Sequence, residues 1–313
     1  MSRAGIKERV RVLALVLWCV LSWGDGAVLA QVNGCGGGVC NPLLYCFNPS
    51  YTGPGDAEPG ASDFESCARA YNAAYASSGG VACIVRRASD NTTINLNVLP
   101  AGFVNIAPVL AFCASTTCFV TQANDQTLAN VCSAAPCNLT QATQSKQPQL
   151  LFNCYNGWPC LVFAGGQFLA NSSLTTIAQP FTFSFVAQRT GAYTSYGSVL
   201  SNTGGQVQTG FANAANEVFA VASGSVPTEP ALDGSFHAVG IVLNGASTAI
   251  AVDGGYPATI NPGSASLTSG LVWGAGSLSS NYATAESTEV GVWPSNIGAT
   301  GLGLINANQQ AFY

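Results

Sequence analysis

Cysteines crowd the first half of the chain and constrain its fold more than any other feature. Of the 12 cysteines, Cys19 lies near the N-terminus and the other eleven lie between positions 35 and 160. Such a density is typical of disulfide-bonded, exported domains. The odd number leaves one thiol free or in an intermolecular bond. Short spacings predict three small disulfide loops, and a fourth pair is expected to tie a helix to a strand: Cys113–Cys118, Cys132–Cys137, Cys154–Cys160 and Cys67–Cys83.

The N-terminal segment has the form of an export signal. Four cations within Met1–Arg11 precede the apolar run Val12–Trp23, which is short for a membrane span, and small residues follow at Val28–Ala30. We therefore expect residues 1–30 to be a cleaved signal peptide, with a retained signal anchor as the alternative. This predicts a secreted protein, extracellular or periplasmic, that is free of the membrane after cleavage.

Charge is sparse, which excludes one class of partner. Asp, Glu, Lys and Arg make up 7% of the sequence. A nucleic-acid partner requires a cluster of cations to displace counterions, and the chain has none. Zinc competes with the disulfide interpretation, but there is no C-x-x-C pair and His237 is the only histidine. The composition therefore predicts no metal and no cofactor, and it suits either neutral glycan ligands or a structural extracellular role.

One helix is expected near the start of the folded domain. Residues 31–62 are rich in Gly, Pro and Cys and are interpreted as an arm, followed by a domain over residues 63–313. Ser62–Glu65 has the form of a capping box, which predicts a helix to about Ser77.

Short strand signals dominate the rest of the chain. Pro180–Arg189 alternates aromatic with small or polar residues, as a half-buried strand does, and two apolar runs flank the Asn244-Gly245 turn as in a hairpin. Ala299–Phe312 is expected to form a short C-terminal helix. The chain is therefore predicted to be an all-β protein, one antiparallel β-sandwich with a short helix near each end. Further strands are expected at residues 81–85, 92–98, 119–122, 150–153, 160–163, 197–201, 206–211, 217–222 and 287–293.

Four motifs in order carry a family resemblance. They are V-R-R-A-S-D-N-T-T at Val85–Thr93, F-C-A-S-T-T-C at Phe112–Cys118, N-D-Q-T at Asn124–Thr127 and N-L-T-Q-A at Asn138–Ala142. This order resembles the catalytic domain of α-L-arabinofuranosidase B, whose family reads V-K-R-A-S-D-G-T-T, F-C-x-x-T-T-C, Y-D-Q-S and N-H-L-T-x-A. The resemblance implies a concanavalin-like or laminin-G-like sandwich, glycoside hydrolase chemistry and an extracellular, arabinose-containing glycan as partner.

The same resemblance puts the catalytic pair in question. The family carries its glutamate in T-G-N-G-H-M-E-A and its aspartate in G-I-G-G-D-N-S-N. The corresponding segments here are Thr203–Thr209, with amides, and Gly274–Asn281, with Ser277 near the aspartate position. The family's adjacent cysteine pair is also missing. Because an amide cannot act as a carboxylate nucleophile, the resemblance implies a glycan-binding or structural protein with a degenerate site. The alternative is an active arabinofuranosidase.

Other carboxylates offer only weak catalytic candidates. Glu217 and Glu289 lie at strand starts, where a solvated strand end is the competing role. Asp233 and Asp253 lie in hairpin turns and are expected to cap backbone N–H groups. Asp125 is expected in a structural or substrate-lining turn. No G-x-S-x-G motif accompanies His237, which favours a structural histidine.

Sugars stack on aromatic faces, so exposed rings are the candidate ligand-binding residues. Trp158 is the first choice, because its loop is closed by Cys154 and Cys160; a ring packed over the disulfide is the alternative. Further candidates are Tyr155, Trp273 and Tyr282. Three N-x-Ser/Thr sequons, which matter only if the source cell glycosylates them, lie at Asn91, Asn138 and Asn171.

Overall fold

The structure, a computed structural model, describes residues 51–313 except 128, 130, 134–135, 193–195, 213–216, 225–227, 233 and 256–258. The predicted signal peptide and most of the predicted arm lie outside these residues. The described residues belong to one compact unit. Among the described residues, no helix has the length and apolarity needed to cross a membrane.

Antiparallel strands make up most of the described chain. They are β1 (Asp63–Ser66), β2 (Val81–Arg87), β3 (Thr93–Asn97), β4 (Cys118–Ala123), β5 (Leu139–Thr140), β6 (Gln149–Tyr155), β7 (Trp158–Ala164), β8 (Leu169–Asn171), β9 (Phe181–Arg189), β10 (Tyr196–Asn202), β11 (Val207–Ala212), β12 (Glu217–Ala222), β13 (Thr228–Ala231), β14 (His237–Leu243), β15 (Thr248–Val252), β16 (Thr259–Ile260), β17 (Leu271–Trp273) and β18 (Thr284–Trp293). The helices are α2 (Pro54–Ala57), α3 (Ala73–Ser78), α4 (Ile106–Phe112) and α5 (Gly298–Phe312), with short 3-10 turns at Gln144–Lys146 and Gly245–Ser247.

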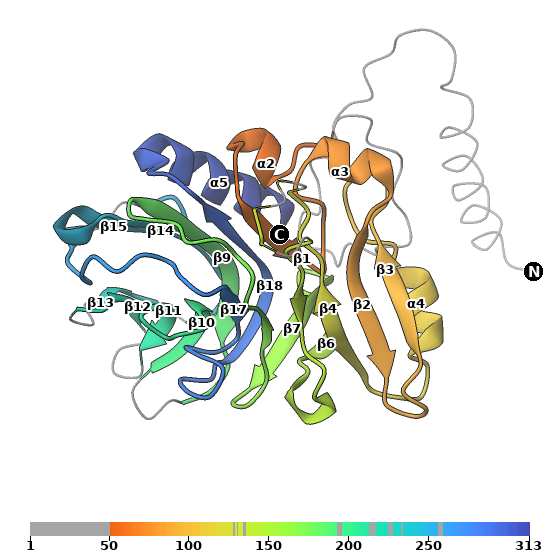
Figure 1. Ribbon diagram of the computed structural model, residues 1–313. Helices are drawn as coiled ribbons and strands as arrows, with labels where there is room; N and C mark the ends of the chain where they lie inside the picture. The colour runs from red at the N-terminus through yellow and green to blue at the C-terminus, as the bar shows by residue number, and fades with distance from the viewer. Residues whose placement is uncertain are drawn as a thin grey trace, which may run out of the picture. The chain divides into compact units, whose positions relative to one another are not determined.

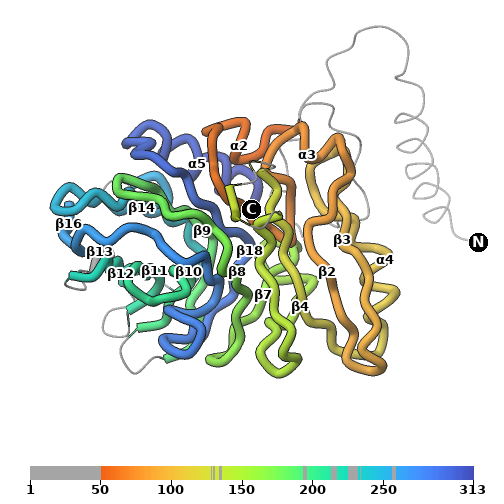
Figure 2. Tube along the Cα trace, in the orientation of Figure 1, coloured from red at the N-terminus to blue at the C-terminus, as the bar shows by residue number. Residues whose placement is uncertain are grey.

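Strand pairing gives two series that form the sandwich. One runs β3-β2-β4-β6-β7-β18-β9-β14-β15-β16, and the other runs β5-β8-β17-β10-β11-β12-β13 (Figures 1 and 2). They are joined where β4 pairs with β5. β18 is central: it pairs with β9 along one edge, and with β7 and then β1 along the other. The predicted all-β sandwich is confirmed.

The core lies between the two series and is rich in phenylalanine. Phe181, Phe183 and Phe185 on β9 are all fully buried, and Phe185 meets Phe211 of β11 edge-on at 6.2 Å between ring centroids. Such apolar surface is the main stabilising contribution to a sandwich.

The prediction that Pro180–Arg189 is a half-buried strand is wrong, because both faces of β9 are buried over most of its length. On the face opposite the phenylalanines, Thr182 and Ser184 are buried too, because α5 lies along this side of β9, β14 and β18 (Figure 1). Gln309 of α5 donates from Nε2 to Ser184 Oγ at 3.0 Å. The close approach also requires Gly240 on β14, where an added Cβ would lie 2.4 Å from Leu302 Cδ2.

The predicted helix from Ser62 to Ser77 is wrong over most of its length. Residues Asp63–Ser66 form β1, whose backbone pairs with β18 in the register Asp63↔Val292. A local capping signal is worth only about 1 kcal/mol, so a complete ladder with a buried strand overrides it. Only α3 is helical: Asn72 caps it by accepting from Tyr75 N at 2.8 Å, and it ends at Gly79 with φ 65°. α4 was not expected from the sequence.

Four disulfides support the part of the sandwich that contains β2 to β7. They join Cys67–Cys83, Cys113–Cys118, Cys132–Cys137 and Cys154–Cys160, the pairs that spacing suggested. The first ties β2 to the segment after β1 rather than to a helix, since the expected helix is absent there. The remaining cysteines lie outside the described residues.

Candidate functional site

The two segments that the resemblance singled out are neighbours in the structure. β10 pairs with β11 on one side and with β17 on the other, in the register Leu200↔Trp273. The antiparallel register places the turn between β10 and β11, residues 203–206, beside the start of β17. The turn that follows β17 folds back to meet it, since an added Cβ at Gly205 would lie 3.1 Å from the Gly276 carbonyl oxygen. Two segments about 70 residues apart in sequence are thus brought to one place, and Gln208 and Asn281 connect them.

Gln208 is the centre of this site. Its side-chain Oε1 accepts from Asn281 Nδ2 at 2.8 Å and from Ser198 Oγ at 3.0 Å, while its Nε2 donates to the Gly205 carbonyl at 2.6 Å. Gln208 is 9% exposed, so these bonds are largely shielded from water. In the described part of the chain, its hydrogen-bond partners are a hydroxyl, a backbone carbonyl and an amide, and all three are neutral.

Two glycines bring the backbone close to the Gln208 amide, and neither position has room for a larger side chain. An added Cβ at Gly276 would lie 2.2 Å from Gln208 Oε1. Gly205 adopts φ 74°, and an added Cβ there would lie 3.1 Å from the Gly276 carbonyl. Both glycines are therefore needed where the two turns meet.

A second amide sets the shape of the β10–β11 turn. Asn202, fully buried, accepts from Val207 N at 2.9 Å and donates to Gln206 Oε1 at 3.0 Å and to the Thr268 carbonyl at 3.1 Å. With both donor and acceptor groups satisfied, Asn202 holds the turn in one conformation. Sequence reasoning did not find Asn202 or Ser198 as members of the site, and it included Asn281 only as the end of the Gly274–Asn281 segment, because such polar residues are common in ordinary turns.

The outer part of the site is a hydroxyl-rich turn. Ser277 and Ser280 are exposed or half-exposed, and their Oγ atoms lie 2.8 Å apart. Tyr282, at the end of this turn, is half-buried against Phe168, with ring centroids 6.3 Å apart. Tyr282 follows Asn281 directly and forms a β-bridge with Ser198, the residue whose hydroxyl donates to Gln208, so Tyr282 is the predicted aromatic platform that the structure connects to this site.

Trp273 lies next to the same turn but belongs to the core. Its side chain is fully buried, its Nε1 donates to Ser287 Oγ at 3.1 Å, and its ring contacts Phe163. Its ring has no surface for a sugar. The expectation that Trp273 binds ligand is therefore corrected.

Trp158 and Tyr155 lie on another side of the sandwich. Trp158 is 8% exposed and stacks on Phe312 of α5, with ring centroids 4.5 Å apart. Tyr155 is half-buried and stacks between Phe236 and Tyr313. These rings anchor α5 to the sheet. Trp158 is therefore a packed ring rather than an exposed platform, and its ring partners are Phe103 and Phe312.

Glu289 forms a buried ion pair instead of facing a cleft. Both of its oxygens bind Arg69, at 2.7 Å from Nε and 2.8 Å from Nη2, and both side chains are fully buried. Gln309 Nε2 and Tyr313 OH also donate to this carboxylate, at 3.0 and 2.8 Å. Glu289 is therefore in a structural position. Glu217, at the start of β12, is half-buried and opposes Ala231 on β13, with no carboxylate partner among the described residues.

The remaining polar candidates have structural contacts. Asp253 caps the backbone as expected, accepting from Ala238 N at 2.9 Å, and its other oxygen is 2.7 Å from His237 Nδ1. Asp125 is 8% exposed and accepts from Thr127 N and Oγ1 at 2.9 and 2.8 Å, as in a structural turn. Asp233 lies outside the described residues.

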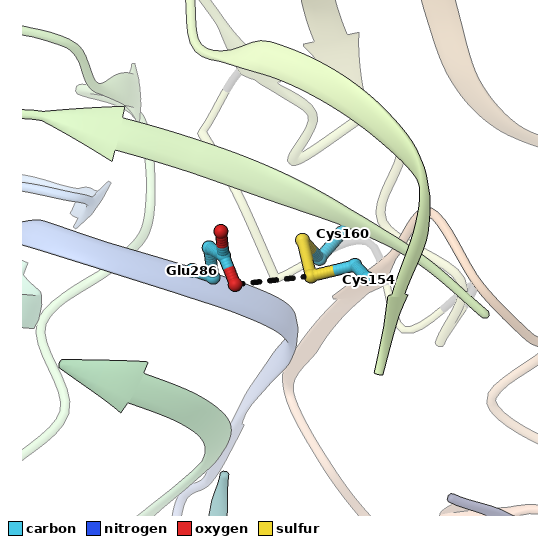
Figure 3. A group of neighbouring side chains, drawn as sticks. All are labelled: Cys154, Cys160 and Glu286. Atoms are coloured by element: carbon cyan, nitrogen blue, oxygen red, sulfur yellow. Dashed lines mark hydrogen bonds between the residues drawn. A yellow bond between two sulfur atoms is a disulfide. The ribbon is translucent and has the colours of Figure 1, made fainter. Parts of the chain in front are cut away.

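One cysteine group has the spacing of a metal site but not its chemistry. Cys154, Cys160 and Glu286 come together where β6 and β7 lie beside β18 (Figure 3). Glu286 Oε2 is 3.5 Å from Cys154 Sγ. Because both sulfurs are in the disulfide, neither can supply the thiolate that zinc binds, and the sulfur has no proton to donate. Partial burial raises the pKa of Glu286 above its ordinary value.

Comparison with known proteins supports the family suggested by the motifs. The family model described as "Alpha-L-arabinofuranosidase B, catalytic" matches residues 58–155. The resemblance to the arabinofuranosidase B catalytic domain is confirmed. The matched range contains β1 to β6 and all four motifs in full, including the disulfide-closed loop at Cys113–Cys118. No curated protein matches the chain.

Solved arabinofuranosidases share the fold. One is a glutamate-to-glutamine mutant of a GH54 α-L-arabinofuranosidase soaked with 4-nitrophenyl α-L-arabinofuranoside, at 17% identity and a TM-score of 0.66. Another is an arabinofuranosidase complexed with arabinofuranosyl-α-1,2-xylobiose, at 19% identity and a TM-score of 0.64. Each match covers 83% of this chain and 65% of the solved chain. The chain thus spans somewhat less than two thirds of the length of these relatives, and the likeness establishes the fold alone.

Proposed function

We propose that the chain is an exported, arabinofuranosidase-like sandwich that binds an arabinose-containing glycan at the Gln208–Asn281 site without hydrolysing it. The observation that carries the proposal is the Gln208 amide, which is bonded to neutral groups in the segment where the family has its glutamate. Four disulfides are in keeping with export.

Hydrolysis of a glycosidic bond in a retaining enzyme requires two carboxyl groups about 5 Å apart, one as nucleophile and one as acid and base. Gln208 cannot form a glycosyl ester, and Ser277 has no base among its hydrogen-bond partners in the described part of the chain, which are Ser280 and the backbone of Ser279. The accessible hydroxyls of Ser277 and Ser280 do offer both donors and acceptors, which suits the hydroxyl groups of a neutral sugar. The site is therefore better matched to binding than to catalysis.

Tyr282 is expected to supply the stacking surface of this site. Replacing Tyr282 with alanine should weaken binding of an arabinofuranosyl oligosaccharide about tenfold to a hundredfold, by analogy with the roughly 1–3 kcal/mol that an aromatic ring contributes to stacking on a base. Isothermal titration of the wild-type chain and the variant measures the change.

Tyr155→Ala is the matched control, because Tyr155 is also a half-buried tyrosine but stacks near α5, on Phe236 and Tyr313. It should leave the oligosaccharide affinity unchanged. Equal loss in both variants would assign the effect to folding. Unchanged affinity in Tyr282→Ala would place the glycan elsewhere on the molecule.

A further inference from the structure

Two buried carboxylates of the sandwich have no hydrogen-bond partner. Asp63 and Glu65 are separated by one residue in β1, so their side chains project from the same side of the strand. Both side chains are fully buried, and within the described residues none of their four oxygens has a hydrogen bond of good geometry, although Glu65, Asp125 and the Asn171 amide lie close enough to Asp63 to shift its pKa. An ionised carboxylate buried without a partner is among the most costly arrangements in a protein interior, so something must compensate this pair.

A third carboxylate lies against the first. Asp125, from the turn that follows β4, and Asp63 have oxygens within 4.8 Å of one another, near the Cys137 sulfur. Burial raises the pKa of Asp125 above its ordinary value, and the hydrogen bonds that it accepts from Thr127 offset part of this rise. Burial and then the charge of Asp125 raise the pKa of Asp63 well above its ordinary value, and burial and then Asp63 raise that of Glu65.

The described cations have contacts elsewhere. Arg69 binds Glu289, and Arg87 binds Asp90. Arg86 donates to Gln147 and Asn91, Arg189 to the carbonyls of Gly191 and Ala212, and Lys146 lies over the Phe168 ring. A side-chain cation from the described part of the chain is therefore not what balances Asp63 and Glu65.

We propose that Asp63, Glu65 and Asp125 bind one divalent cation, and that the cation is calcium. Calcium takes oxygen ligands at about 2.3–2.6 Å, so two ligand oxygens on opposite sides of one ion lie up to about 5 Å apart. The spacing of the Asp63 and Asp125 oxygens fits this limit. Cys137 is bonded to Cys132, so the group has no thiolate to favour zinc or copper. The ion would link β1 to the turn after β4, and the inference is independent of glycan binding.

Two measurements test the proposed calcium site: the metal content of the purified protein and its melting temperature. The full chain, purified, stripped with EDTA and then dialysed against calcium chloride, is expected to retain about one calcium per chain by elemental analysis. Its melting temperature in 1 mM calcium chloride should exceed that in EDTA by about 5–10 °C, the shift expected for an ion present well above its dissociation constant. Magnesium chloride at the same concentration should give a smaller shift, because magnesium requires tighter octahedral geometry.

Charge-neutral substitutions identify the ligands. Asp63→Asn with Glu65→Gln should remove both calcium retention and the calcium-dependent shift, whereas Asp90→Asn, at an exposed turn carboxylate, should keep both. If the double variant does not fold, the calcium content of the wild-type chain still decides the proposal.

The alternative to calcium is that protons neutralise Asp63 and Glu65, and this outcome would overturn the proposal. Carboxyls with raised pKa values in the folded state bind protons there that the unfolded state has released, so stability falls as pH rises above the unfolded value near 4. A chain that retains no calcium, melts at the same temperature in calcium and EDTA, and gains stability as pH falls from 7 to 5 would show that protons neutralise Asp63 and Glu65. A magnesium shift as large as that of calcium would contradict the choice of ion.

Discussion

Replacing Arg69 with alanine is expected to lower the free energy of unfolding by about 3–5 kcal/mol, because it leaves the Glu289 carboxylate buried without its charge partner. Arg69 contributes more than charge. Its guanidinium also donates to Asn308 Oδ1 at 2.8 Å and lies 4.6 Å from the centre of the Phe312 ring, so it holds α5 against β18. Urea denaturation of the wild type and the variant measures the loss.

Arg87→Ala is the matched control for Arg69. Arg87 is also paired with a carboxylate, that of Asp90, and also lies over a phenylalanine ring, but its side chain is 34% exposed. Water screens such a pair, so its removal should cost far less. Similar losses in the two variants would mean that the buried pair contributes no more than a surface pair does.

Trp273→Ala is expected to lower the free energy of unfolding by about 3–5 kcal/mol, as large-to-small changes of fully buried aromatics do. The variant removes the ring that contacts Phe163 across the core and the indole N–H that donates to Ser287. The measurement is again urea denaturation, made beside a titration with an arabinofuranosyl oligosaccharide.

Trp273→Phe separates packing from recognition. It keeps most of the apolar volume but loses the hydrogen bond to Ser287, so a smaller cost of about 1–3 kcal/mol is expected. A Trp273→Ala variant that kept wild-type stability and lost only glycan affinity would restore the original prediction of Trp273 as a sugar platform.

Strand positions could be predicted from the sequence because alternation is a local property. Phe181, Phe183 and Phe185 repeat with a period of two, and the strand that contains them spans Phe181–Arg189 as expected. The capping-box prediction at Ser62–Glu65 failed for the opposite reason. The partner of β1 is β18, more than 200 residues away in sequence, and no local pattern reveals that pairing.

The candidate site was only partly predictable for the same reason. The resemblance identified both segments, but the bond between Gln208 and Asn281 depends on β10 lying between β11 and β17. Burial of Trp158 likewise depends on α5, whose Phe312 covers the ring. Aromatic residues look the same in sequence whether they face the core or a ligand, so burial had to come from the structure.

Binding of a glycan without cleavage at the Gln208–Asn281 site is tested by the release of the aryl alcohol from an aryl α-L-arabinofuranoside by the purified chain, followed over hours at high protein concentration. We expect no release above that of buffer, while titration with an arabinofuranosyl oligosaccharide should give saturable binding. Turnover of about one per second or faster, within the range of working enzymes, would show that the site is catalytic.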